Sequence, residues 1–346
     1  MSEGFARVVV TKDHFGANLL FNRDLINAGY VKKLGNLGVD GLRYPGGTIA
    51  EQYFDITNAD VPPSHFGDGF VSLSEYLSAC NALQLSATIV LPTKRYAGDP
   101  EGAKADLRRF LLDLEAGVYG TVPRVLSLEV GNEFYATSSE VERISAPAYA
   151  QIADAMVKEI LATPVSNFDL RVGVQMGRQL HEARDISEYL GASGTIGSID
   201  QLHFSDYPWT ASAVAPRLEV RSELNHVWRD NGFDGDLVAS EWNIASHRNA
   251  ALTSSRDWGM DQLPAILEIF TEHLVFGVDQ SFGWAVQQNN KTSLTGNAGD
   301  ATIFGSGVLL GLMSRNLPGR YYLEEQQDLI TSGEIYGETY YFGGTN

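Results

Sequence analysis

Short apolar or β-branched runs alternate along the chain with segments whose apolar residues have helical spacing. This alternation is typical of repeated βα units, which build a parallel sheet. We count eight units. The strands are expected at His14 to Phe21, Gly41 to Tyr44, Ser86 to Leu91, Leu126 to Val130, Leu170 to Gln175, Ile199 to Phe204, Leu237 to Ser240 and Gln280 to Trp284. The clearest helices are expected at Asp24 to Leu37, Leu73 to Leu83, Ala103 to Leu114, Pro147 to Leu161, Ala213 to Asp230 and Gln262 to Phe276.

Eight strands, each followed by a helix, predict an α/β protein with a (β/α)₈ barrel over residues 1–316. An open doubly wound sheet is the alternative. It favours a glycine-rich turn after the first strand, and the segment 21–24 there, Phe-Asn-Arg-Asp, has no glycine. Residues 317–346 change character, with strands expected at Arg320 to Glu324 and Glu338 to Phe342. We expect a β-rich C-terminal extension that packs on the barrel or leads to a further domain.

The composition favours a chain with a large core and a neutral partner. Of the 346 residues, 44% are hydrophobic, and the net charge of -18 repels nucleic acid and anionic membranes. No basic segment followed by an apolar run opens the chain, and no stretch reaches about 18 unbroken apolar residues. The sequence therefore predicts a soluble chain without a classical signal peptide. It leaves the compartment and the oligomeric state open.

Two glutamates stand at the ends of predicted strands. Glu133 follows the fourth strand in Glu-Val-Gly-Asn-Glu, and Glu241 follows the seventh in Ser-Glu-Trp-Asn. With regular alternation, Glu129 and Glu133 share one face of their strand. Carboxylates at the C-terminal ends of barrel strands project into the active-site mouth, where two of them can cleave a glycosidic bond. A separation of about 5–5.5 Å predicts retention of configuration, and about 6.5–9.5 Å predicts inversion.

Other chemistry-bearing residues also fall at strand ends. Arg43 ends the second strand, where its guanidinium can hold a carboxylate ionised by a bidentate bond, or form an ion pair with Glu129 or Asp40. His203 and Tyr207 end the sixth strand. Aromatic rings that can pack on the apolar side of a sugar are Trp284 and, as weaker candidates, Trp209 and Trp242.

The sequence lacks signatures of metal and serine chemistry. No His-x-His, His-Glu-x-x-His or Cys-x-x-Cys pattern occurs, and no Gly-x-Ser-x-Gly elbow is present. We therefore expect no metal and no cofactor.

Taken in order, the motifs Arg-Tyr-Pro-Gly-Gly, Glu-Val-Gly-Asn-Glu and Ser-Glu-Trp-Asn resemble those of clan A glycoside hydrolases. The likeness is strongest to the branch of β-xylosidases, α-L-arabinofuranosidases, β-glucuronidases and heparanase. It implies that Glu133 is the acid/base, Glu241 the nucleophile and Asn132 a ligand of the sugar 2-hydroxyl. It further implies that Arg43, His203 and Tyr207 support the nucleophile or the sugar. Thr48 stands where related enzymes often have Asn.

The leading hypothesis from the sequence is a retaining hydrolase of O-glycosidic bonds in a poly- or oligosaccharide. A non-catalytic carbohydrate-binding barrel is the alternative from another class. Transglycosylation by the same two glutamates is a third outcome, decided by whether water or sugar reaches the glycosyl intermediate. The sugar, its linkage and the choice between internal and terminal cleavage stay open.

Overall fold

A computed structural model describes the greater part of the chain. The described residues are 9–21, 30–63, 70–138, 141–208, 213–244, 262–288, 290, 292–296, 302–322 and 342–344. Trp209, the N-terminal part of the helix expected from Asp24 and most of the strand expected from Glu338 lie outside them.

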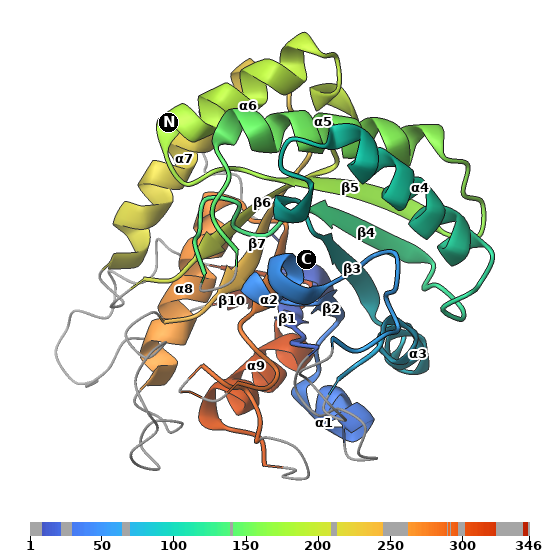
Figure 1. The fold of residues 1–346 in the computed structure, drawn as a ribbon. Coiled ribbons are helices and arrows are strands. Elements are labelled where there is room, and N and C mark those ends of the chain that lie inside the picture. The colour runs from blue at the N-terminus through green and yellow to red at the C-terminus, as the bar shows by residue number, and fades with distance from the viewer. Residues whose placement is uncertain are drawn as a thin grey trace, which may run out of the picture.

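Eight parallel strands close into a barrel in which each strand pairs with the next and β8 pairs with β1 (Figure 1). The strands are β1 (Gly16–Asn18), β2 (Gly41–Tyr44), β3 (Ser86–Leu91), β4 (Val125–Val130), β5 (Asp169–Gln175), β6 (Gln201–Asp206), β7 (Asp236–Trp242) and β8 (Gln280–Gly283). The closed barrel confirms the predicted fold class and excludes the open sheet.

Helices surround the barrel, and in Figure 1 α4 to α7 lie along its upper side while α8 and α9 lie at the lower left. Their bounds are α1 (Tyr30–Leu37), α2 (Thr48–Tyr53), α3 (Leu73–Leu83), α4 (Pro100–Glu115), α5 (Ala146–Ala162), α6 (Leu180–Ala192), α7 (Val214–Asp230), α8 (Leu263–Phe276) and α9 (Gly305–Asn316). The 3₁₀ turns are η1 (Lys12–Phe15), η3 (Lys94–Tyr96) and η4 (Ile196–Ser198).

Local signals explain where several helices begin. Ser72 caps α3 in a reciprocal capping box with Glu75, and Asp99 caps α4 ahead of Pro100 at the first helical position. Helices α2, α6 and α9 are not among the clearest sequence signals. The first has only six residues and the last begins with Gly-Ser-Gly, so neither has a strong apolar period.

The barrel interior is filled by side chains from facing strands. Phe282 of β8 occupies the space left by Gly16 and Gly41, because a Cβ atom on Gly16 would lie 2.4 Å from the ring. Polar groups also lie near the N-terminal ends of the strands, where Gln201 Nε2 donates to Gln280 Oε1 at 2.8 Å between the first residues of β6 and β8. Buried charges, in contrast, gather toward the C-terminal ends of the strands around Arg43.

The C-terminal appendage is a two-stranded antiparallel sheet of β9 (Arg320–Tyr322) and β10 (Phe342–Gly344), as expected. Val10 N donates to Arg320 O, and the ring of Phe342 lies 6.5 Å from that of Phe270 in α8. The sheet thus packs on the barrel through the N-terminal segment and α8. The division into domains at residues 316 and 317 stays a prediction.

Candidate active site

A one-residue bulge in β7 turns Glu241 toward the barrel axis. Phe204 of β6 pairs with Ala239, but the next residue, Ser205, pairs with Glu241, so Ser240 is the extra residue of β7. A bulge of this kind re-aims the side chains that follow it. Glu241 is 3% exposed and accepts hydrogen bonds inside the barrel mouth.

The same bulge places Trp242 on the outer side of the strand. Its ring lies 5.7 Å from that of His273 in α8 and is 2% exposed. Because successive side chains of a strand point to opposite faces, Glu241 and Trp242 cannot both face the mouth. The sugar contact predicted for Trp242 conflicts with this placement, since its indole is buried between β7 and α8.

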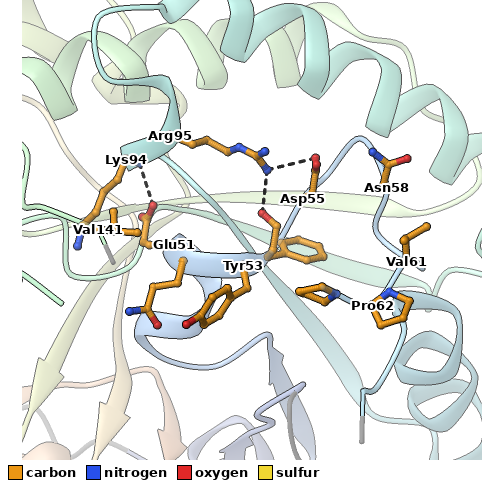
Figure 2. Close-up of a pocket in the computed structure, with 12 residues that line it drawn as sticks. Glu51, Tyr53, Asp55, Asn58, Val61, Pro62, Lys94, Arg95 and Val141 are labelled. Carbon is orange, nitrogen blue, oxygen red and sulfur yellow. Dashed lines mark hydrogen bonds and ion pairs between the residues drawn. The ribbon is translucent and has the colours of Figure 1, made fainter. Parts of the chain in front are cut away.

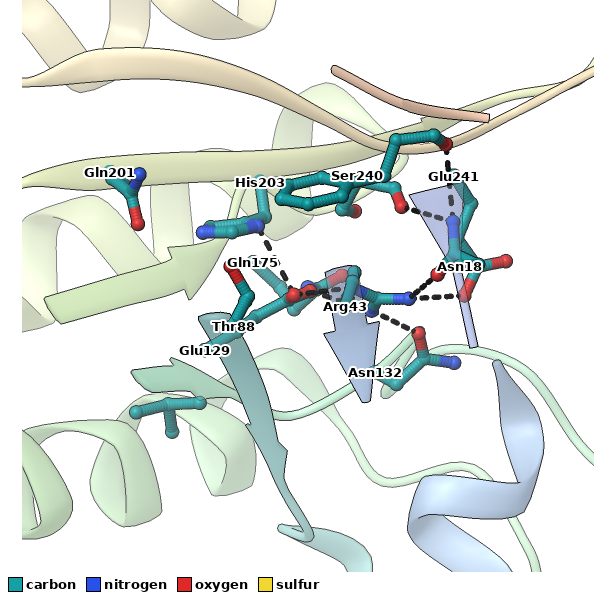
Figure 3. Close-up of polar contacts among 12 residues, drawn as sticks. Asn18, Arg43, Thr88, Glu129, Asn132, Gln175, Gln201, His203, Ser240 and Glu241 are labelled. Carbon is teal, nitrogen blue, oxygen red and sulfur yellow. Dashed lines mark hydrogen bonds and ion pairs between the residues drawn. The ribbon is translucent and has the colours of Figure 1, made fainter. Parts of the chain in front are cut away.

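Arg43 is the centre of the buried polar layer, and Figure 3 shows its contacts. All five of its N–H groups are used. Nε and Nη2 form a bidentate pair with Glu129 at 2.5 and 2.8 Å, and Nη1 donates to Glu241 at 2.9 Å. The remaining two donate to Asn18 and Asn132. Of the two kinds of contact predicted for Arg43, the ion pair with Glu129 is made and is the bidentate one, whereas Glu241 receives a single bond.

Glu129 neutralises Arg43 and is itself held from three sides. Besides Arg43, Gln175 Nε2 donates to its Oε1 at 2.6 Å, and His203 Nδ1 lies 3.2 Å from its Oε2. Burial acts to raise the pKa of Glu129, but Arg43 and His203 outweigh it and lower the pKa to about 2. His203 is 1% exposed and fits only because its neighbour is Gly173, where a Cβ would lie 2.2 Å from Nε2. Glu129 is thus a permanent anion inside the barrel.

Glu241 carries an unusual electrostatic environment. Burial raises its pKa to about 7 and the charge of Glu133 acts in the same direction, whereas Arg43 and Tyr207 act against them. Tyr207 Oη donates to its Oε2 at 2.9 Å. Since Arg43 is already paired with Glu129, it compensates Glu241 only in part. The charge of Glu133 therefore disfavours a second anion at Glu241.

Glu133 does not continue β4, which ends at Val130. Gly131 has φ 83° and Glu133 itself has φ 41°, the left-handed region that a non-glycine residue rarely adopts. The alternation expected from Glu129 to Glu133 therefore breaks at Gly131. Glu133 N donates to Gln175 Oε1 at 3.4 Å, while within the described part of the chain no residue donates to its carboxylate.

Asn132 lies beside Glu133 and is 2% exposed. Its Oδ1 accepts from Arg43, and in Figure 3 its Nδ2 points away from the guanidinium. That Nδ2 is buried and has no hydrogen-bond partner among the described residues. A buried amide donor without a partner is costly, so this atom is suited to bind a ligand oxygen.

Glu51 of α2 fixes the loop that carries Asn132 and Glu133. Its carboxylate, in a residue 3% exposed, accepts four hydrogen bonds of 2.8 to 2.9 Å. The donors are Thr93 N, Thr93 Oγ1, Lys94 N and Asn132 N. One carboxylate therefore ties the ends of β3 and β4 to α2.

Aromatic side chains form one wall of the mouth. Trp284 follows β8 and precedes a cis peptide bond to Ala285, and its ring meets that of Tyr207 edge to face at 6.4 Å. Gly47 has φ 74°, and a Cβ there would lie 2.2 Å from the Trp284 ring. The second glycine of Pro-Gly-Gly therefore serves both the turn and the close approach of this half-buried indole.

The structure brings the predicted residues Arg43, Asn132, Glu133, His203, Tyr207, Glu241 and Trp284 to one end of the barrel. Sequence reasoning missed Asn18, Glu51 and Gln175. Gln175 is a polar residue that ends a predicted strand, which is the same signal that singled out Glu241. Asn18 lies inside the strand predicted from His14 to Phe21 and ends the shorter strand that forms. Glu51 lies on a short helix and carries no comparable signal.

The residues that the structure describes contain no group of three His, Cys, Asp or Glu side chains that is arranged to hold a metal ion. Of their helices, none has the length and apolar character that crossing a membrane requires.

Solved structures with the same fold are known. The chain matches a GH51 arabinofuranosidase from Xanthomonas axonopodis pv. citri, with a TM-score of 0.63, 14% identity, and 93% of this chain and 76% of that chain covered. A glucosidase from Croceicoccus marinus matches with a TM-score of 0.66, 9% identity and coverage of 91% and 70%. The catalytic domain of GH30 xylanase C from Talaromyces cellulolyticus matches with a TM-score of 0.55 and 12% identity, and the match covers 97% of this chain and 82% of that chain.

The matched GH51 and GH30 enzymes belong to clan A, so the resemblance predicted from the motifs is confirmed as a shared (β/α)₈ fold. No family model matches the sequence, and no curated protein is similar to it.

Proposed function

We propose that this chain is a retaining glycoside hydrolase that cleaves O-glycosidic bonds of a poly- or oligosaccharide by double displacement. Glu241 is the nucleophile and Glu133 the acid/base. The observation that carries the proposal is the contrast between the two carboxylates. Glu241 accepts hydrogen bonds from Arg43 and Tyr207, which favour its anion, whereas no described residue donates to the carboxylate of Glu133.

The proposed roles require Glu133 to carry a proton and Glu241 to be ionised when the substrate is bound. Glu133 gives this proton to the oxygen of the leaving sugar while Glu241 Oε attacks the anomeric carbon, forming a glycosyl-enzyme ester. In the second step Glu133, now ionised, takes a proton from water, whose oxygen displaces Glu241. Each proton and each bond to the anomeric carbon is thus accounted for, and both carboxyls return to their first state.

The surrounding residues have positioning roles in this proposal. Arg43 and Tyr207 orient Glu241, and Asn132 Nδ2 offers a hydrogen bond to a sugar hydroxyl beside it. Trp284 presents an aromatic wall to the apolar face of the ring. His203 acts through Glu129, because it is buried beneath the mouth. The glycosidase fold of the matched structures supports this reading.

The test is a polysaccharide and aryl-glycoside screen followed by substitution of Glu241. Glu241→Gln should reduce turnover by about 10⁴-fold or more, since the covalent route is lost, while circular dichroism remains that of the wild type. Product analysis by NMR should show the retained anomer first. Wild-type turnover by the variant, or an inverted first product, contradicts the proposal.

A further inference from the structure

A pocket of about 410 Å³ lies beside the proposed catalytic centre, and Figure 2 shows the residues around it. This volume falls within the roughly 300–1,000 Å³ of small-ligand sites. The lining residues follow β2, β3 and β4: Glu51, Gln52, Tyr53, Phe54, Asp55, Asn58, Val61, Pro62, Pro63, Lys94, Arg95 and Val141. We call it the side pocket.

The side pocket has one apolar wall and one polar wall. The apolar wall is formed by Tyr53, Val61 and Pro62. The side chain of Val61 is 62% exposed. Asp55 and Arg95 lie across from them in Figure 2. A sugar residue has the same division, since one face of the ring carries C–H groups and its rim carries hydroxyls that bind polar side chains.

The charges of the side pocket balance. Its lining contains two carboxylates, Glu51 and Asp55, and two cations, Lys94 and Arg95. The Glu51 carboxylate is occupied by four donors, and Asp55 is paired with Arg95 at 3.1 Å. A neutral ligand therefore fits this lining better than an acidic or a basic one. An acidic ligand would be repelled by the two carboxylates, and a basic ligand by the two cations.

The side pocket borders the loop of Glu133 through two of its lining residues. Glu51 accepts from Asn132 N, and Lys94 Nζ donates to Ala136 O at 2.7 Å. Burial lowers the pKa of Lys94, and the charges of Glu51 and Glu133 act against it, so the ammonium lies within electrostatic reach of both. A ligand in the side pocket is therefore adjacent to the acid/base rather than in a separate part of the molecule.

We propose that the side pocket is a subsite for a second sugar residue of a neutral oligosaccharide whose neighbouring sugar lies between Glu133 and Glu241. This inference rests on the proposed function for the identity of the neighbouring site. It adds that the chain recognises at least a disaccharide unit, and that the segment after β2 selects it.

The experiment measures binding, so that it does not depend on turnover. In a Glu241→Gln background, calorimetry compares cellotetraose, xylotetraose and mannotetraose with the corresponding monosaccharides. Val61→Trp fills the side pocket, and Val118→Trp is the matched control, because Val118 is 59% exposed and lies before β4 at the opposite end of the barrel. Arg95→Met, with the 92% exposed side chain of Arg124 changed to Met as control, tests the polar wall without filling the pocket.

We expect the best tetrasaccharide to bind at least about tenfold more weakly to the Val61→Trp protein and about fivefold more weakly to the Arg95→Met protein. Neither control should change the affinity, and neither variant should alter monosaccharide binding. Unchanged tetrasaccharide affinity in both pocket variants overturns the subsite. The subsite is also overturned if the Glu241→Gln protein itself binds none of the three tetrasaccharides. If pocket-dependent binding occurs and wild type cleaves none of them, the subsite stands and the proposed function fails.

Discussion

Arg43 and Glu241 are joined by a single hydrogen bond of 2.9 Å, while Arg43 gives its bidentate pair to Glu129. One guanidinium thus serves two buried carboxylates. Glu129 takes most of the positive charge and keeps a low pKa, and Glu241 is left with a raised one. The division of this charge is the physical basis of the first three predictions.

The pH dependence of activity should reflect the raised pKa of Glu241. A nucleophilic carboxylate must be ionised, and burial raises the pKa of Glu241 to about 7, so the nucleophilic form is lost as pH falls below that value. We expect kcat/KM to fall about tenfold per pH unit below about pH 7. Measurement of kcat/KM from pH 4 to 9 checks this, and a profile that stays flat from pH 7 down to pH 4 contradicts it.

The pH dependence of stability should change in the Glu241→Gln protein. The pKa of Glu241 is about 7 in the fold against an ordinary value of 4.5, so the folded state binds a proton more tightly and loses stability as pH rises through that interval. The difference corresponds to about 3 kcal/mol. We expect the variant to gain up to about that free energy of unfolding over wild type at pH 8, and little at pH 4. Urea unfolding at both pH values tests the sign; an equal difference at pH 4 and 8 excludes the linkage.

Glu129→Gln removes the main anionic partner of Arg43, so the guanidinium should stabilise the Glu241 anion more strongly. The pKa of Glu241 then falls, so the acid limb of kcat/KM moves to lower pH, while loss of the buried partner costs about 3–5 kcal/mol of stability. Glu159→Gln is the control, because Glu159 is also 3% exposed and paired with Arg108, but on the outer helices. The control should leave the pH profile unchanged, and an unmoved limb in Glu129→Gln refutes the shared-charge account.

Tyr207→Phe removes a 2.9 Å donor from Glu241 Oε2. A hydrogen bond to a charged group contributes about 1.5–3 kcal/mol, so kcat/KM should fall roughly 10- to 100-fold and the acid limb should move to higher pH. Tyr96→Phe removes a comparable 3.0 Å contact with Asp106 between η3 and α4 and serves as the control. Equal losses in the two variants would mean that Tyr207 acts only through stability.

Glu51→Gln should misplace the acid/base without touching substrate. The amide cannot accept all four donors, which leaves the loop of Asn132 and Glu133 less constrained at a cost of about 1–3 kcal/mol. We expect kcat on substrates with poor leaving groups to fall about 100-fold, and kcat on dinitrophenyl glycosides to change little, because they need no acid. Glu75→Gln, in the capping box of α3, controls for loss of a structural carboxylate. Equal losses on both substrate types would show that Glu51 has no effect specific to proton donation.

The sequence predicted the barrel well because its strands are short apolar runs with turns between them. Strands β2 and β3 have the expected bounds, whereas β6 and β7 extend two residues further, to Asp206 and Trp242. Ser205, Asp206 and Glu241 among these added residues are polar or charged, which resembles a loop in sequence. In the fold Asp206 is paired with Arg217 and His273 of the outer helices, and Glu241 is bonded to Arg43 and Tyr207.

The candidate site was predictable in its members but not in its contacts. Strand-end position identified Arg43, Glu133 and Glu241. Which carboxylate forms the bidentate pair with Arg43 depends on how side chains from different strands lie beside one another inside the barrel. The burial of Trp242 depends on the extra residue in β7. Neither feature can be recognised in the sequence of a single strand.

The bulge at Ser240 makes the direction of the Glu241 side chain depend on strand register. If Ser240 paired with Ser205 in regular register, Glu241 and Trp242 would exchange faces, turning an indole into the mouth and a carboxylate against α8. Ser240 Oγ donates to Phe204 O and Ser240 O accepts from Asn18 Nδ2, which holds the extra residue in place. Inserting one residue between Ser240 and Glu241 should therefore turn the carboxylate out of the mouth, even where substitutions of Ser240 itself are accepted.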